Sequence, residues 1–325
     1  MSQLTVNRMV PTRDVCAVVL LLLLLILTGA LSGCRPGASE GPAEQTEPQA
    51  SRIISTAPAI TETVIALGEE KRLIAVSQFC AYLDEVRQLP KVGGLYNPNI
   101  EEMIRLNPDL IILDSGAVDL AARLHTLGIE TLVMDTRSLQ GIINAIVNIG
   151  RHCGPDAEAR AKQVAETLYE HLQQVRARTS QGEKPSVLLV LDRPLHARTF
   201  SSFYAAGNNP LFNEIIEIAG GRNVLGESPF AVSGLSLESV IDLDPDYIFD
   251  LTTNDSISQM SQEEQEKLKP ELLADWENFR EQVRAVRSGH VYPLLEHYAT
   301  VPGPNINLLV EAMAQVLHPE NSPTE

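Results

Sequence analysis

Two acidic residues, Glu101 and Glu238, occupy the same position in two copies of one short pattern. The copies span residues 99–109 and 236–246, and an apolar run follows each of them. The chain therefore offers one carboxylate at an equivalent place in each half. A glutamate in the first turn of a helix also stabilises the helix dipole, so the residues alone leave a binding role and a structural role open. Catalysis would instead need a nucleophile with its base, or two carboxylates across one cleft.

Each copy predicts a helix, a Pro-Asp turn and a strand. The helices begin at polar caps, Asn99 and Ser236, and end before Pro108 and Pro245, because the residue that precedes proline is disfavoured in the α region. At about 100° per residue, one side of each helix is apolar, which turns both glutamates away from the core. The apolar positions are Ile100, Met103, Ile104 and Leu106 in the first helix, and Leu237, Val240, Ile241 and Leu243 in the second.

The beginning of the chain has the pattern of an export signal. Basic residues precede an apolar run over residues 15–27, which is too short to span a bilayer comfortably. The run ends in Leu-Ser-Gly-Cys, which resembles a bacterial lipobox and predicts lipid on Cys34. We therefore expect a lipoprotein signal over 1–34 and attachment to the extracytoplasmic face of a membrane. Residues 35–51 contain no large apolar side chain and predict a flexible tether.

The remaining chain predicts an α/β protein with two lobes joined by one long helix. Its predicted strands are short apolar runs, which is typical of strands covered on both faces. We assign an N-terminal lobe to 52–155, a connecting helix to 156–182 and a C-terminal lobe to 183–325. In the second lobe we predict a polar loop after the strand at 247–249, and then a helix around 276–286. Trp276 is predicted to lie in the core.

Composition excludes several classes of function. The net charge of −17 leaves no basic surface for nucleic acid. The seven histidines include no closely spaced pair, so we expect no resident metal or cofactor. In an exported protein, Cys80 and Cys153 form either a disulfide or two buried thiols, and the sequence leaves both open.

Several short motifs, in their order and spacing, resemble the cobalamin and ferric-siderophore class of ABC-transporter substrate-binding proteins. The resemblance implies a two-lobed periplasmic-binding-protein fold, a monomer, and a ligand in the cleft between the lobes. It also implies that Glu101 and Glu238 dock onto arginines of a permease, which works with an ATPase. The motifs are RIIS at 52–55, APAITE at 57–62, LPKVGG at 89–94, NIE at 99–101, NPDL at 107–110, AGGRNV at 219–224, PGP at 302–304 and LHPE at 317–320.

Ligand contacts are expected in the loops that converge on the cleft, where aromatic residues recur and offer flat faces to a large planar ligand. The expected contacts are Pro58, Ala59, Phe79, Tyr82, Tyr96, Asn97, Arg193, Phe200, Tyr204, Phe230, His297 and Tyr298. A cobalamin or another corrinoid is the first expectation. Where many relatives read Cys-Asp-Tyr-Pro, this chain has Cys80-Ala81-Tyr82-Leu83, which weakens the transfer of a ligand by analogy.

Other ligands and roles remain open. Arg193, His196 and Arg198 offer positive charge to an anionic ferric siderophore. His297 offers an imidazole to a haem iron. A free metal ion is disfavoured by the histidine spacing. A lipoprotein that only senses its ligand, without a permease, would have no need for equivalent carboxylates on both lobes.

Overall fold

The computed structural model describes residues 49–94, 97–195, 202–252, 257 and 260–321. All of the described residues belong to one compact unit, Glu47–Glu325. The predicted signal, lipobox and Cys34 lie outside the described residues.

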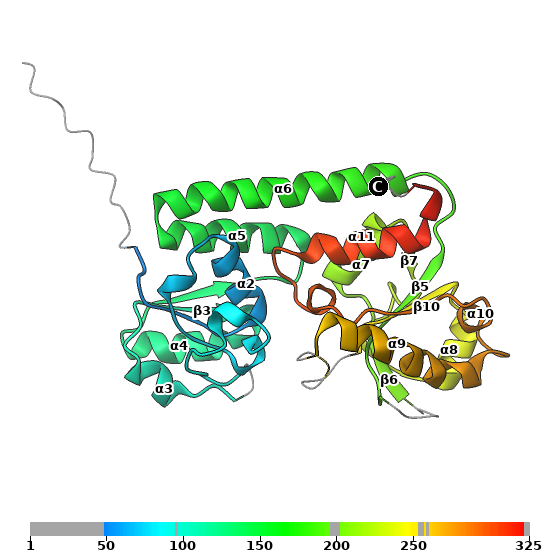
Figure 1. The fold of residues 1–325 in the computed structure, drawn as a ribbon, viewed down its shortest axis with the longest axis horizontal. Coiled ribbons are helices and arrows are strands. Elements are labelled where there is room, and N and C mark those ends of the chain that lie inside the picture. Colours follow the sequence, from blue (N-terminus) through cyan, green and yellow to red (C-terminus); the bar gives the residue numbers. More distant parts are fainter. Residues whose placement is uncertain (1–48, 95–96, 196–201, 253–256, 258–259, 322–325) are drawn as a thin grey trace, which may run out of the picture. The chain divides into compact units, whose positions relative to one another are not determined.

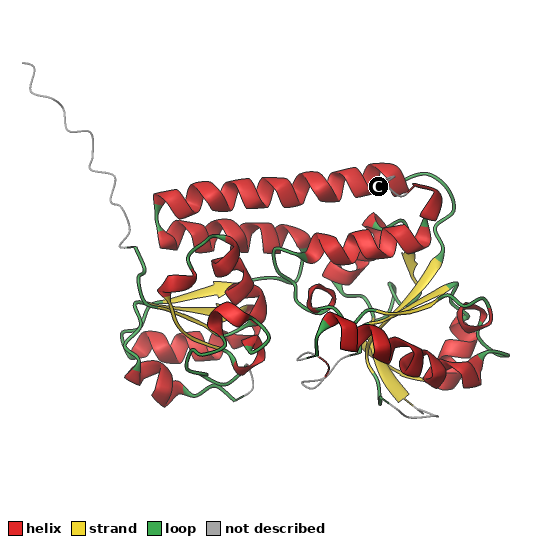
Figure 2. Cartoon of the chain, in the orientation of Figure 1, coloured by secondary structure: helices red, strands yellow, loops and turns green. Residues whose placement is uncertain are grey.

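The N-terminal lobe is built on a four-stranded parallel sheet with the order β2-β1-β3-β4. Figure 2 shows the strands in yellow, with red helices beside them. Its helices follow the strands along the chain, as parallel pairing requires. The strands are β1 (Ile53–Ser55), β2 (Leu73–Val76), β3 (Leu110–Asp114) and β4 (Thr131–Met134). The helices are α2 (Pro58–Ala66), α3 (Ile100–Arg105), α4 (Val118–Thr126) and α5 (Leu139–Cys153).

The C-terminal lobe contains a six-stranded mixed sheet with the main order β10-β9-β5-β6-β8, and β7 pairs with β5. Strands β10, β9 and β5 are parallel, whereas β6 and β8 are antiparallel to their neighbours. The strands are β5 (Ser186–Asp192), β6 (Ser202–Ala206), β7 (Arg222–Asn223), β8 (Val232–Ser236), β9 (Tyr247–Asp250) and β10 (Val291–Pro293). The helices are α7 (Pro210–Ile218), α8 (Leu237–Leu243), α9 (Gln262–Trp276), α10 (Arg284–Arg287) and α11 (Ile306–Leu317).

One long helix, α6 (Pro155–Thr179), leads from the first lobe to the second. It packs along α5 of the N-terminal lobe and along α7 and α11 of the C-terminal lobe, as Figure 1 shows for α5 and α11. The helix occupies most of the segment assigned to the connecting helix, 156–182, and begins one residue before it.

The central strands of both sheets, such as β3 and β5, are covered on both faces, as the apolar runs predicted, whereas β6 and β8 leave one face exposed. Alternate residues of β3 face different clusters: Leu110 and Ile112 belong to the largest cluster, and Ile111 and Leu113 to a smaller one. Strand β5 alternates in the same way, with Leu189 in the largest cluster. Because the largest cluster contains residues of both sheets and of α5, α6, α7 and α11, the lobes share one continuous hydrophobic core.

The two repeats fold alike in detail. Asn99 caps α3 by accepting a hydrogen bond from the Glu102 amide, and Ser236 caps α8 by accepting one from the Ser239 amide. Each repeat then has a residue with positive φ directly before its proline, Asn107 at 48° and Asp244 at 37°. Asparagine and aspartate tolerate this conformation better than most residues. The turn chemistry is therefore the same in both lobes.

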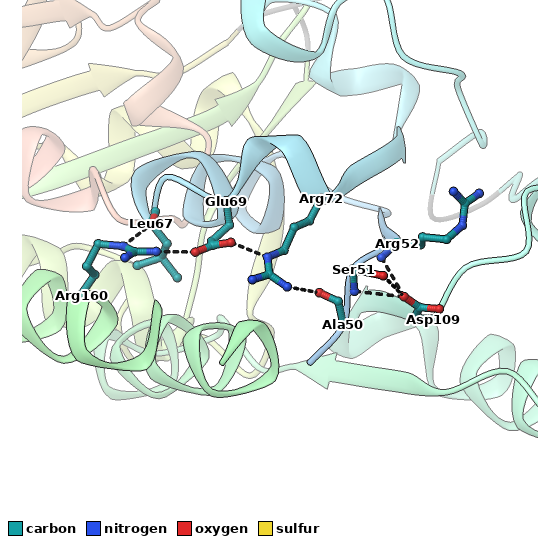
Figure 3. Close-up of polar contacts among 8 residues, drawn as sticks. All are labelled: Ala50, Ser51, Arg52, Leu67, Glu69, Arg72, Asp109 and Arg160. Carbon is teal, nitrogen blue, oxygen red and sulfur yellow. Dashed lines mark hydrogen bonds and ion pairs between the residues drawn. The ribbon is translucent and has the colours of Figure 1, made fainter. Parts of the chain in front are cut away.

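The last aspartate of each repeat fixes the start of its lobe's sheet. Asp109 Oδ2 accepts hydrogen bonds from the Ser51 amide (3.0 Å) and hydroxyl (2.6 Å), and Asp246 Oδ2 accepts the same pair from Ser186 (2.8 and 2.6 Å). Figure 3 shows the first of these clusters.

A second set of contacts fixes Ala50, the residue before this cluster. Its carbonyl accepts a hydrogen bond from Arg72, which also pairs with Glu69, and Glu69 pairs in turn with Arg160 of α6 (Figure 3). The Ala50 amide donates to the His152 carbonyl (2.9 Å). The folded body thus begins before Arg52, and the last residues of the predicted 35–51 tether are part of it.

Replacing Asp109 with asparagine is expected to lower the free energy of unfolding by about 1 kcal/mol at neutral pH, since one carboxylate oxygen serves several donors. The Ser51 hydroxyl, with the Ser51 and Arg52 amides, lowers the pKa of Asp109 below its ordinary 3.8. A lowered carboxylate pKa stabilises the folded state at higher pH, and this contribution is lost as the pH falls below about 4. Urea denaturation at pH 7 and pH 3 measures it. The difference between the variant and the wild type should be smaller at pH 3 than at pH 7, whereas a control change at exposed Asp242 should show little difference at either pH.

Two predictions for the second lobe are wrong. The segment before Trp276, predicted as a polar loop, contains helix α9, and Trp276 is its last residue rather than the start of a helix. The helix is opened by a reciprocal cap between Ser261 and Glu264, and it contains Pro270. Trp276 is nevertheless in the core, as predicted, with 1% of its surface exposed.

None of the helices in the described ranges combines the length and the apolar character that a bilayer span requires.

Candidate functional site

The two lobes meet where the segments that follow β1 and β2 contact the segment that follows β10. The Tyr82 hydroxyl donates to Glu62 Oε1 (2.5 Å), and its ring stacks on His297 with centroids 3.7 Å apart and planes 12° apart. Asn305 Nδ2 donates to Glu62 Oε2 (3.4 Å). Tyr82 and His297, both predicted to contact ligand, are thus brought together, each with one ring face covered by the other.

Burial governs the protonation of this junction. It raises the pKa of Glu62, which is 9% exposed, although the hydrogen bonds from Tyr82 and Asn305 act in the opposite direction. Burial also lowers the pKa of His297 and raises the pKa of the neighbouring Tyr298 to about 12. His297 is therefore favoured as the neutral imidazole and Tyr298 as the phenol at neutral pH.

Pro58 and Ala59, the first residues of α2, lie at the same junction. Ala59 is 7% exposed and faces Pro302 and Gly303 across a small gap. A larger cavity of about 210 Å³ opens further along the junction, and it is small for a drug-sized ligand. It is lined by Thr136, Arg137, Asn209, Leu211, Phe212, Ala299, Thr300, Val301, Pro302 and Ile306.

Phe79 offers an exposed aromatic face beside the junction. It follows β2, three residues before Tyr82, and is 47% exposed. Its ring lies against Gly94, where an added Cβ would come within 2.5 Å of the ring. Asn97 is exposed and accepts a hydrogen bond from the Gly94 amide. The structure therefore brings the predicted residues Phe79 and Asn97 together around one glycine.

A second exposed aromatic surface lies on the ladder of β6 and β8. Tyr204 pairs with Gly234 and Ala206 with Val232, and opposed residues of a ladder share a face. Tyr204 is 56% exposed, Val232 47%, and Phe230, just before β8, 65%. The neighbouring Phe203 turns inward and is 3% exposed. Two predicted residues, Tyr204 and Phe230, thus remain accessible.

Arg193 is not available to a ligand, which corrects its assignment. It is 3% exposed, and its Nε donates to Asp250 Oδ2 (2.6 Å) while its Nη1 donates to Asp275 Oδ2 (2.8 Å). The guanidinium also lies 5.7 Å from the centroid of the Trp276 ring. Its charge is compensated inside the lobe, so it no longer supports an anionic ligand.

Four further predicted residues, Tyr96, His196, Arg198 and Phe200, lie outside the described residues.

The glutamates of the two repeats are both exposed, one on each lobe. Glu101 lies on α3 and Glu238 on α8, each in the first turn. Hydrogen bonds from its own backbone amide and from Ser236 lower the pKa of Glu238.

Cys80 and Cys153 are buried free thiols, which decides between the two alternatives. Burial raises the pKa of each to about 11, so both remain protonated at neutral pH. In the part of the chain that the structure describes, no three His, Cys, Asp or Glu side chains are arranged to hold a metal ion.

Sequence reasoning missed the roles of Glu62 and Asn305. Both lie in the motifs that carried the resemblance or beside them, APAITE and PGP, but their contact joins residues 243 positions apart. The available signal in the sequence was Glu62 itself, a single charged residue in the helix PAITETVIA, which is otherwise made of apolar residues and threonines.

Comparisons with known proteins agree on one family. A family model described as periplasmic binding protein matches residues 53–298. The uncharacterized ABC transporter substrate-binding lipoprotein YvrC of Bacillus subtilis is 26% identical over 277 residues, which cover 83% of this chain and 80% of YvrC. A vitamin B12-binding protein of Vibrio parahaemolyticus is 27% identical over 266 residues, which cover 80% of this chain and 87% of that protein.

The fold is similar to that of solved structures as well. The periplasmic heme-binding protein RhuT of Roseiflexus sp. RS-1, in its apo form, matches with a TM-score of 0.65 and 22% identity. The match covers 84% of this chain and 99% of RhuT, so it includes both lobes.

Proposed function

From the premise that this chain belongs to the periplasmic binding protein family, and is a substrate-binding protein of the ABC-importer type rather than an enzyme, we propose that it carries a corrinoid of the cobalamin class. In this proposal the ligand lies between the lobes and is delivered to a permease that works with an ATPase. Lipid on Cys34 attaches the protein, as a monomer, to the extracytoplasmic face of a membrane, in keeping with the lipoprotein name of YvrC.

The observation that carries the proposal is the exposure of aromatic side chains in a chain that has few of them. Aromatic residues make up 5% of the sequence. Among the described residues the exposed ones are Phe79, Tyr169, Tyr204 and Phe230, and three of these four were predicted as ligand contacts. Exposed aromatic faces suit a large, partly apolar ligand such as a corrinoid.

A haem or a ferric siderophore is the alternative ligand. RhuT, a structural neighbour, is a heme-binding protein, and His297 supplies an imidazole at the junction. Against an anionic siderophore, Arg193 is buried in ion pairs with two aspartates. A protein that only senses its ligand, without a permease, would not need an exposed glutamate at the same position of each lobe. Glu101 and Glu238 are both exposed, which favours delivery to a permease.

Binding is tested by calorimetric titration of the full chain in detergent with cyanocobalamin, hemin and ferrichrome. We expect a response to cyanocobalamin. Calorimetry is preferable to tryptophan fluorescence, because Trp276, the single tryptophan, is buried in the second lobe. A response to hemin or ferrichrome alone would replace the corrinoid by that ligand, and no response to any of them would contradict the proposal.

Replacing Phe79 or Phe230 with alanine is expected to weaken cyanocobalamin binding by about fivefold each, since each change removes one aromatic contact worth about 1 kcal/mol. Tyr169 is a matched control, because it is 52% exposed on α6 and was not predicted to contact ligand. Its replacement with alanine should leave the affinity unchanged. An equal loss in all three variants would refute the assigned contacts.

A further inference from the structure

Four polar or aromatic side chains tie the two lobes together at one point. Glu62 of α2 and Tyr82 after β2 belong to the N-terminal lobe, whereas His297 and Asn305 belong to the C-terminal lobe. Two contacts cross the junction: the stack of Tyr82 on His297, and the hydrogen bond from Asn305 to Glu62. The Tyr82 hydroxyl joins them by donating to the same carboxylate.

The backbone around this point leaves little room for relative motion while the contacts hold. An added Cβ on Gly303 would lie 3.3 Å from Glu62 Oε2 and 3.4 Å from the Ala59 Cα, so the chain of one lobe passes close to α2 of the other. A second polar contact between the lobes lies at α5, where the Leu139 amide donates to Glu214 of α7 (3.0 Å).

The cost of burying Glu62 makes such a contact reversible. The carboxylate is 9% exposed, and burial is the largest influence on its pKa, which is raised. Separation of the lobes would break its hydrogen bond from Asn305 but would return the carboxylate to water. Because the regained hydration offsets the lost contacts, the junction can hold the lobes without locking them.

We propose that Glu62, Tyr82, His297 and Asn305 form an interlobe latch, which holds the lobes together at their junction and must open before they separate. Phe79 lies three residues before Tyr82 on the same segment, so the latch lies beside one of the aromatic faces assigned to the ligand. The effect on ligand release, although not the latch itself, rests on the proposed function.

Hydrogen exchange of the ligand-free full chain tests the latch. The reporters are the amides of Thr300, Val301 and Gly303, which are bonded only within the C-terminal lobe. Glu62→Ala is expected to speed their exchange by about tenfold, because it breaks a contact made from the other lobe. Glu62→Gln keeps an acceptor for Tyr82 without a buried charge, and its amide can donate to Asn305 Oδ1 once the Asn305 amide turns over, so its exchange should be no faster than that of the wild type. Tyr82→Phe keeps the ring stack and should lie between Glu62→Ala and the wild type.

Glu69→Ala is the matched control for general destabilisation. Glu69 is also a largely buried carboxylate, and it pairs with Arg72 and Arg160. Neither of these arginines belongs to the sheet of the C-terminal lobe. It should leave the three reporter amides unchanged. Unchanged exchange in both Glu62→Ala and Tyr82→Phe, or an equal increase in Glu69→Ala, would overturn the latch. Should Glu62→Ala fail to fold, Tyr82→Phe decides alone.

A separate measurement connects the latch to release. Tyr82→Phe is expected to speed the dissociation of cyanocobalamin several-fold, to about the extent that it speeds the exchange. Faster exchange together with unchanged dissociation would retain the latch and reject its link to release. Absent cyanocobalamin binding in the wild type would reject the proposed ligand, and the exchange data would be unaffected.

Discussion

Replacing Asp250 with alanine is expected to lower the free energy of unfolding by about 3–5 kcal/mol, the largest effect on stability that we predict, because it leaves a buried guanidinium short of a counter-charge. Asp250 is 1% exposed, and its Oδ2 accepts hydrogen bonds from Arg193 Nε (2.6 Å) and Trp276 Nε1 (3.0 Å). Its Oδ1 accepts from the Thr252 amide (3.1 Å). Urea denaturation followed by circular dichroism measures the change.

The exposed pair of Arg280 and Glu277 is the matched control. Their ion pair is 2.7 Å long, but both side chains are 51% exposed. Replacing Glu277 with alanine should lower the free energy of unfolding far less than the change at Asp250, since water and salt screen such a pair. Similar losses for the Asp250 and Glu277 variants would contradict the view that Arg193 depends on its buried partners.

Replacing both Glu101 and Glu238 with alanine is expected to weaken association with the permease by at least about a hundredfold, because each lost charge-assisted contact is worth about 1.5–3 kcal/mol. Uptake of labelled cyanocobalamin by cells that produce the importer should fall in parallel. Ligand affinity, measured by calorimetry, should not change, because both side chains are exposed and lie on α3 and α8 rather than at the lobe junction.

Glu102 supplies a control within the same helix. Its carboxylate is bonded to Arg105 at 2.6 and 2.8 Å, so its charge is already taken up within α3. Replacing Glu102 with alanine should leave uptake nearly intact. If uptake survived the double change at Glu101 and Glu238, the docking role of the two glutamates would be rejected.

The parts of the fold that local chemistry determines were predictable. The repeated caps, Asn99 and Ser236, and the prolines that end the helices each act within a few residues. The apolar runs of β2, β3 and β9 likewise predicted strands, since a strand buried on both faces has few polar positions. These signals sufficed to predict two α/β lobes and a connecting helix.

The errors arose where signals conflicted. The segment after β9 was predicted as a polar loop, but the cap formed by Ser261 and Glu264 starts a helix, which also accommodates Pro270. Strands β6 and β8 were not predicted because serine, alanine and glycine interrupt their apolar positions. Their pairing with each other, and not their composition, makes them strands.

The candidate site was less predictable because it depends on long-range contacts. Arg193 resembled a ligand residue until its partners, 57 and 82 positions away, were placed beside it. Glu62 was overlooked for the same reason. Phe79 and Phe230 were predicted from their own loops alone and are both exposed, and their contact with a ligand stays a prediction.

The core shared by the two sheets and by α5, α6, α7 and α11 has a consequence for engineering. Neither half is a self-contained module, because cutting the chain anywhere along α6 would expose apolar surface on both fragments. A chimaera that exchanged one half with a relative would have to import its matching helices too. Heat should therefore melt residues 49–321 in a single transition, with no stage in which one half survives alone.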